Sequence, residues 1–99
     1  MKSSKNRYQL VVVLNPKMTD KDREILLDKV KVEMEKEGVK VKKREAMGLK
    51  NLSYEIKGFN QGDFWIFDIR GRNGLKLDDL NVFLNREVGI IRYLILKVF

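Results

Sequence analysis

Two carboxylate pairs and one glycine pattern are the residues of this sequence whose types and spacing could support catalysis. They are Asp20 with Asp22, Asp78 with Asp79, and Gly71-x-x-Gly74. Paired carboxylates can act as general acid and base, and glycines can form a phosphate-binding loop. Each carboxylate pair, however, stands where a helix is expected to begin, and capping and the helix dipole account for acidic side chains there. The glycine pattern is too short for a phosphate loop, so we predict no catalytic residue and no enzyme.

Imidazole and thiol chemistry is absent, because the 99 residues include no His and no Cys. Without these side chains the chain has no common zinc ligand set, no disulfide and no imidazole base. We therefore expect no metal site, no cofactor and no small-molecule substrate.

Basic side chains are more informative, since 21 Lys and Arg against 14 Asp and Glu leave a formal charge of +7. A charge of this sign attracts polyanions such as nucleic acid or an anionic membrane surface. The longest aliphatic run, Leu10 to Leu14, is too short to span a bilayer, and the charged start of the chain lacks the apolar core of a signal segment. We expect a soluble cytoplasmic protein that does not act at a membrane.

The length favours one compact domain over residues 1–99, because two separate cores would each be marginal at 11.7 kDa. Hydrophobic residues make up 43% of the chain, which is enough for a core, and 35% are charged, which implies a strongly ionised surface.

The first half of the chain predicts a strand, a helix and a second strand. Residues 8–14 are rich in β-branched side chains and end before Pro16. Thr19 begins a capping pattern, and apolar residues then recur at helical spacing until Gly38 supplies a left-handed stop. From Val39 to Ile56 the pattern returns to alternation, interrupted near Gly48, where we expect a bulge.

The second half predicts a strand, a helix and a last strand. The segment 58–62 contains turn residues, and residues 64–69 read as a buried strand. Leu77, Leu80, Phe83 and Leu84 have helical spacing, and residues 90–98 form an apolar strand. The order βαββαβ predicts an α+β ferredoxin-like fold, with a four-stranded antiparallel sheet and both helices on one face.

Alternation along the strands predicts which side chains face away from the helices. The outward set is aliphatic or aromatic and consists of Val11, Val13, Phe64, Ile66, Leu94 and Leu96. An open sheet face normally presents polar residues to water, so an apolar one indicates a partner surface. The alternative is that a tail or loop of the chain covers this face, and residues 1–6 are free to do so.

Basic residues are expected around this apolar face, since Arg7 and Arg92 share its parity. Such a rim would bind phosphate and make the binding dependent on salt. The run from Lys40 to Arg44 has an equally good explanation as a solvated edge strand protected from aggregation.

Two other functions suit the same topology. Lys57, Gly58, Phe59 and Phe64 partly match the octamer of an RNA-recognition motif, but Asn60 to Gly62 do not fit it. An acylphosphatase-like enzyme would need a phosphate loop with a convergent Arg and Asn, for which Arg72 and Asn15 are the nearest candidates.

The segment from Gly48 to Lys57 resembles the characteristic segment of the bacterial small ribosomal subunit protein six family. The matching residues are Gly48, Lys50, Asn51, Leu52, Ser53, Tyr54 and Ile56. Arg7 with Tyr8, the Leu14-Asn15-Pro16 turn, the Gln61-Gly62 pair and the basic last strand resemble the family in the same order, so the resemblance covers roughly Arg7 to Val98.

This resemblance implies a structural protein that binds small-subunit rRNA in the platform region of the ribosome, together with small ribosomal subunit protein eighteen. RNA contacts are then expected from Arg7, Lys50, Arg86, Arg92 and Lys97. Leu52 and Tyr54 are expected to pack inward. Two positions depart from the family pattern: Glu55 stands where relatives often have Pro, and Ile91 stands where they often have a basic residue.

Overall fold

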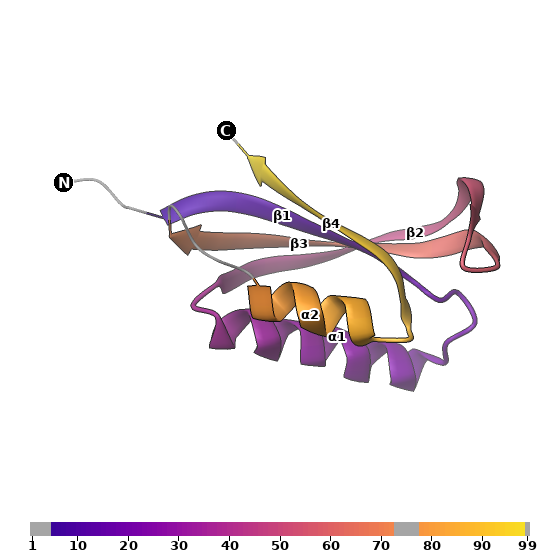
Figure 1. Ribbon diagram of the computed structural model, residues 1–99, viewed down its shortest axis with the longest axis horizontal. Helices are drawn as coiled ribbons and strands as arrows, with labels where there is room; N and C mark the ends of the chain where they lie inside the picture. The colour runs from indigo at the N-terminus through magenta and orange to yellow at the C-terminus, as the bar shows by residue number, and fades with distance from the viewer. Residues whose placement is uncertain (1–4, 73–77, 99) are drawn as a thin grey trace.

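The computed structural model describes residues 5–72 and 78–98, which form one antiparallel sheet and two helices. The elements are β1 (Lys5–Leu14), α1 (Asp20–Lys36), β2 (Lys40–Ile56), β3 (Phe59–Arg72), α2 (Asp78–Arg86) and β4 (Ile90–Val98). The strand order is β2-β3-β1-β4, and Figure 1 shows both helices below the sheet. This is the ferredoxin-like arrangement predicted from the sequence.

Local signals determine where α1 begins and ends. The Thr19 hydroxyl accepts a hydrogen bond from the backbone N–H of Asp22 at 3.1 Å, as a helix cap requires. At the other end Gly38 adopts a φ of 82°, and the N–H of Val39 reaches back to the carbonyl of Met34 at 3.0 Å. Among the described residues, no helix is long and apolar enough to cross a membrane.

The core lies between the helices and the covered face of the sheet. The predicted apolar face of α1 is buried there together with two leucines of α2, namely Leu26, Leu27, Val30, Met34, Leu80 and Leu84. They pack with Leu10, Val12 and Phe67 of the sheet, none of which is exposed to solvent. Leu77, which was predicted on the second helix, lies outside the described residues.

The hairpin of β2 and β3 is longer than the sequence pattern indicated. The register shifts between Ala46 and Gly48, so the expected bulge is present. The predicted turn over residues 58–62 is wrong, because β3 already begins at Phe59. Lys57 and Gly58 both have positive φ, at 51° and 84°, as a two-residue type I′ turn requires, and so no longer loop is needed.

An ion-paired arginine holds β2 against α1. Arg44 faces the helices, where its guanidinium lies 3.1 Å from Glu24 and 3.7 Å from Asp28. The same guanidinium lies 5.5 Å from the ring centroid of Trp65. Arg44 is therefore a structural side chain, and the basic run of β2 is divided between the two faces of the sheet.

Candidate functional site

The sheet face opposite the helices contains the apolar set predicted from alternation. Val11 pairs with Ile66 on one side and Leu94 on the other, which makes an aliphatic row across three strands. Val13 and Phe64 form the next pair along the strands. Leu94 is 52% exposed, whereas Val11, Phe64 and Ile66 are half-buried. This open face therefore presents apolar surface to solvent at its centre and along the edge strand β4.

Exposure falls toward the end of the open face that lies near the hairpin. Val13 is only 5% exposed, although its side chain points away from the helices. Figure 1 shows the end of the β2–β3 hairpin rising on the side opposite the helices, so that it overhangs this part of the sheet. Chain coverage, the alternative raised from the sequence, thus applies to this end of the face, and the hairpin provides the cover.

A hollow of about 260 Å³ lies between the hairpin and β4. Leu52 and Tyr54 of the hairpin line it together with Val11, Phe64 and Leu94 of the sheet. Its walls are therefore largely apolar, which suits an apolar side chain of a partner better than a charged ligand.

A polar bridge closes one side of this hollow. The Nη1 of Arg92 donates a hydrogen bond to the hydroxyl of Tyr54 at 3.1 Å and so joins β4 to the hairpin. Tyr54 is 63% exposed and was predicted to pack inward, and that prediction is wrong. The strand pairing shifts between Asn51 and Ile56, so the alternation counted from the centre of β2 does not extend to Tyr54.

The other end of the open face is charged. Arg7 pairs with Arg70 across β1 and β3, and between them Asp68 lies 2.8 Å from Arg70 Nη1 and 3.4 Å from Arg7 Nε. Burial alone would raise the pKa of Asp68. The hydrogen bond from Arg70 and the charges of both arginines outweigh that effect, and the pKa lies below its ordinary value.

The five cations expected to contact RNA do not form a single patch. Arg92 lies at the hairpin end of the open face and Arg7 at the opposite end. The Nζ of Lys50 lies 6.0 Å from the ring centroid of Phe64, which places Lys50 over the hairpin end as well.

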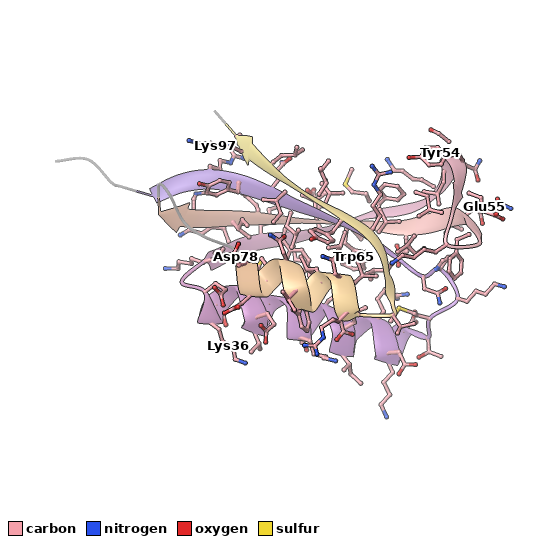
Figure 2. All side chains as sticks on the ribbon, in the orientation of Figure 1. Lys36, Tyr54, Glu55, Trp65, Asp78 and Lys97 are labelled. Atoms are coloured by element: carbon pink, nitrogen blue, oxygen red, sulfur yellow. The ribbon has the colours of Figure 1, made fainter. Side chains whose placement is uncertain are left out.

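The other two expected cations lie elsewhere. Lys97 pairs with Tyr8, whose side chain packs against the core, so Lys97 has the parity of the covered face. Arg86 is in the last turn of α2, within the helical layer. Figure 2 shows the label of Lys97 far from that of Tyr54, with the length of the sheet between them.

Sequence reasoning missed two residues of this face. Arg70 was not selected, although alternation from Phe64 through Ile66 leads directly to it. Tyr54 was assigned to the wrong side, and only the pairing shift in β2 reveals its true position.

The residues of the two alternative functions are not brought together. Lys57 and Gly58 form the hairpin turn, so the partial RNA-recognition octamer lies at the end of the hairpin and not at the centre of the sheet. Asn15 follows β1 directly, whereas Arg72 pairs with Lys5 at the far end of that strand. At about 3.3 Å per residue the two positions are separated by roughly the length of the sheet. The Asn15 carboxamide also accepts a hydrogen bond from the N–H of Lys17.

Comparison with known proteins agrees over most of the chain. The model of the family described as Ribosomal protein S6 matches residues 7–97. Small ribosomal subunit protein bS6 of Thermotoga maritima is 34% identical over 88 residues, which are 87% of this chain and 67% of the relative. Its counterpart in Fusobacterium nucleatum is 26% identical and is matched over 96% of its length by 92% of this chain.

A solved structure agrees as well. The crystal structure of 30S ribosomal protein S6 from Thermotoga maritima superimposes with a TM-score of 0.86 at 30% identity. The superposition covers 96% of this chain and 89% of that one. The likeness therefore extends over the sheet and both helices.

Proposed function

This chain belongs to the ribosomal protein S6 family, and from that premise we propose that it binds the platform region of small-subunit rRNA as a heterodimer with small ribosomal subunit protein eighteen. The family consists of structural constituents of the small ribosomal subunit, so the chain is a ribosomal protein of the cytoplasmic ribosome. The proposal assigns the protein partner to the open face and the RNA to the cations beside it. It includes no enzymatic step, cofactor or membrane, and treats residues 1–99 as one domain.

The observation that supports the protein partner is the exposure of the apolar row on the open face. Leu94 and Leu96 are 52% and 43% exposed on an edge strand, directly beside the half-buried Val11 and Ile66. Burial of such a surface stabilises a complex by about 25 cal/mol for each Å² removed from water. The partner-binding set is therefore Val11, Val13, Phe64, Ile66, Leu94 and Leu96, with Leu94 and Leu96 contributing most of the newly buried area.

The observation that supports RNA binding is the position of the cations at both ends of the apolar row. Arg92 and Lys50 lie at the hairpin end, and Arg7 lies with Arg70 at the other. RNA that spans the face could reach both groups at once. Arg86 and Lys97 would require RNA that wraps around the edge of the sheet, so we assign them a smaller share of the affinity.

Arg92 has a special place in this arrangement, because it is within reach of both proposed ligands. Its guanidinium already donates to Tyr54, and a guanidinium has further N–H groups available for a phosphate. Arg92 can thus bind RNA without releasing the hairpin, and the hollow beneath the hairpin can be occupied by the protein partner at the same time.

The experiment that tests this proposal reconstitutes the complex from three purified components: this chain, small ribosomal subunit protein eighteen and an rRNA fragment of the platform. We expect the two proteins to comigrate in size-exclusion chromatography and to retain the RNA together in a filter-binding assay. Leu94→Asp should abolish comigration, because it places a carboxylate in the centre of the apolar row.

The matched control is Val88→Asp. Val88 is 94% exposed and lies in the turn before β4, away from the open face, so this change should leave comigration intact. Comigration of the Leu94→Asp variant at wild-type level would show that the partner binds elsewhere. Failure of the wild-type proteins to retain RNA would contradict the rRNA assignment.

A further inference from the structure

The helical layer has an exposed apolar strip of its own, on the side of the molecule opposite the open face. Ile25 and Val32 of α1 are 50% and 51% exposed, and Val82 of α2 is 52% exposed. Ile25 and Val32 are seven residues apart, so they lie on one face of α1 about 10 Å from each other. Two adjoining hollows between the helices share Phe83 and Glu33 as lining residues. Together these side chains form a shallow groove, which we call the interhelical groove.

The charges that border the interhelical groove are mainly negative. The border consists of four carboxylates and two cations, namely Asp28, Glu33, Asp79, Glu87, Lys29 and Arg86. One of the cations is neutralised in place, because Lys29 Nζ lies 3.2 Å from Glu87. The border therefore has a negative balance, although the whole chain has a charge of +7.

The backbone around the groove limits what can bind there. Both walls are α-helices, whose N–H and C=O groups are paired within the helix along its middle. An extended peptide would find no backbone partners here, in contrast to the edge of a sheet, and its buried N–H and C=O groups would stay unpaired. A ligand that satisfies its own backbone, that is an α-helix, avoids this cost. α2 has 9 residues, so the groove is about 13 Å long and matches between two and three helical turns.

We propose that the interhelical groove is a second docking site, which binds an amphipathic helix of another protein through an apolar stripe flanked by Lys or Arg. The stripe packs on Ile25, Val32 and Val82, and the basic margins face the carboxylates of the border. A second copy of this chain is a poor occupant, since the helices it could offer have acidic borders of the same kind. The site lies on the opposite side of the sheet from the open face, so it is independent of the proposed rRNA and protein contacts there.

The test uses a synthetic helical peptide of about 14 residues, built from Leu, Ala and Lys with Leu at positions i, i+3, i+4 and i+7. The peptide is titrated into the isotope-labelled full chain while the backbone amide signals are followed by NMR. We expect the amides of α1 and α2 to shift, and a peptide with Glu in place of every Lys to bind at least about tenfold more weakly.

Variants of the chain locate the site. Val32→Ser combined with Val82→Ser should lower the affinity for the Lys peptide at least about tenfold, because both changes remove apolar contact area. Val88→Ser makes the same chemical change at a more exposed position outside the groove and should have no effect. Circular dichroism checks that the double variant keeps its helices.

Three results would overturn the proposal. Equal binding of the Glu and Lys peptides would remove the argument from charge. Amide shifts on β1 and β4 in place of α1 and α2 would show that the peptide binds the open face. A dimer of the chain alone, seen by sedimentation and lost in the double variant, would identify a second copy as the occupant.

Discussion

The two faces of the sheet are made from alternate residues of the same strands, yet only one of them is sealed. Phe67 and Val12, on the helix side, are fully buried. Their neighbours Ile66 and Val11, which are equally apolar, remain half-buried on the open side. The comparison shows that hydrophobic character is similar on both faces, and that burial depends on the layer that lies above each of them. An apolar face without such a layer is available to another molecule.

Charge divides between the layers in a similar way. The two helices contain eight acidic and six basic side chains, whereas the four strands contain four acidic and eleven basic ones. The positive charge of the protein therefore belongs to the sheet. A polyanion such as RNA is attracted to the sheet and a basic helix to the helical layer, so the two proposed sites select different partners.

The comparison of the two faces is tested most severely by adjacent residues on β3. Phe67→Ala should lower the free energy of unfolding by about 3–5 kcal/mol, because it leaves a cavity in the core. Ile66→Ala should lower it by only about 1–2 kcal/mol, since Ile66 is half-buried. Urea denaturation measures both. Equal losses for the two variants would mean that the open face is sealed as tightly as the core.

The next largest effect concerns the hairpin that overhangs the open face. A methyl group added at Gly62 would overlap Cγ1 of Val13, a stiff and buried side chain. Gly62→Ala should therefore lower the free energy of unfolding by about 1–3 kcal/mol and speed hydrogen exchange in the hairpin. Asn60→Ala, at an exposed position of the same strand, should stay within about 0.5 kcal/mol. If the two variants behave alike, the hairpin does not press on the sheet as described.

A smaller effect distinguishes the two layers as RNA ligands. In the RNA-bound heterodimer, Arg92→Ala should make the salt dependence shallower by about 0.7–0.9 log units of affinity per log unit of salt, the value for one phosphate contact. Lys31→Ala removes a cation from α1 and should leave the slope unchanged. Filter binding over a series of KCl concentrations gives both slopes. A change with Lys31→Ala alone would move the RNA to the helical layer.

The smallest effect arises at the charged end of the open face. Because the fold lowers the pKa of Asp68, this carboxylate stabilises the folded state above the ordinary Asp pKa of about 3.9. The contribution is lost as the pH falls below that value and through the lowered pKa of the folded state. Asp68→Asn should remove this acid-dependent part, by less than about 1 kcal/mol for partly exposed ion pairs. Denaturation curves from pH 6 down to about pH 2 provide the measurement, and identical pH profiles for the two proteins would contradict the assignment.

Much of the fold could be predicted because its signals are local. Thr19 and Gly38 determine the ends of α1 through hydrogen bonds within a few residues of each position. The alternation of Val11 with Val12 assigns each side chain to a face as long as the strand stays regular. The apolar face of the candidate site was predictable for the same reason.

The candidate site was predicted less well where the strands are irregular. Tyr54 follows a shift in the pairing of β2 with β3, beyond which counting by twos no longer reports the face. Lys97 was grouped with Arg92 because both lie on the basic last strand, but it is five residues further along and has the opposite parity. The basic rim predicted around the apolar face is consequently two separate groups of cations.

By itself the sequence determined the order of the elements, the helix caps and the apolar character of both sheet faces, because each depends on residues close together in the chain. Only the tertiary structure decided that the hairpin covers one end of the open face, that Arg92 meets Tyr54 and that two exposed helix faces form a groove. These features join residues that are far apart along the chain. Their positions depend on strand register, bulges and turn geometry, which no short stretch of sequence specifies.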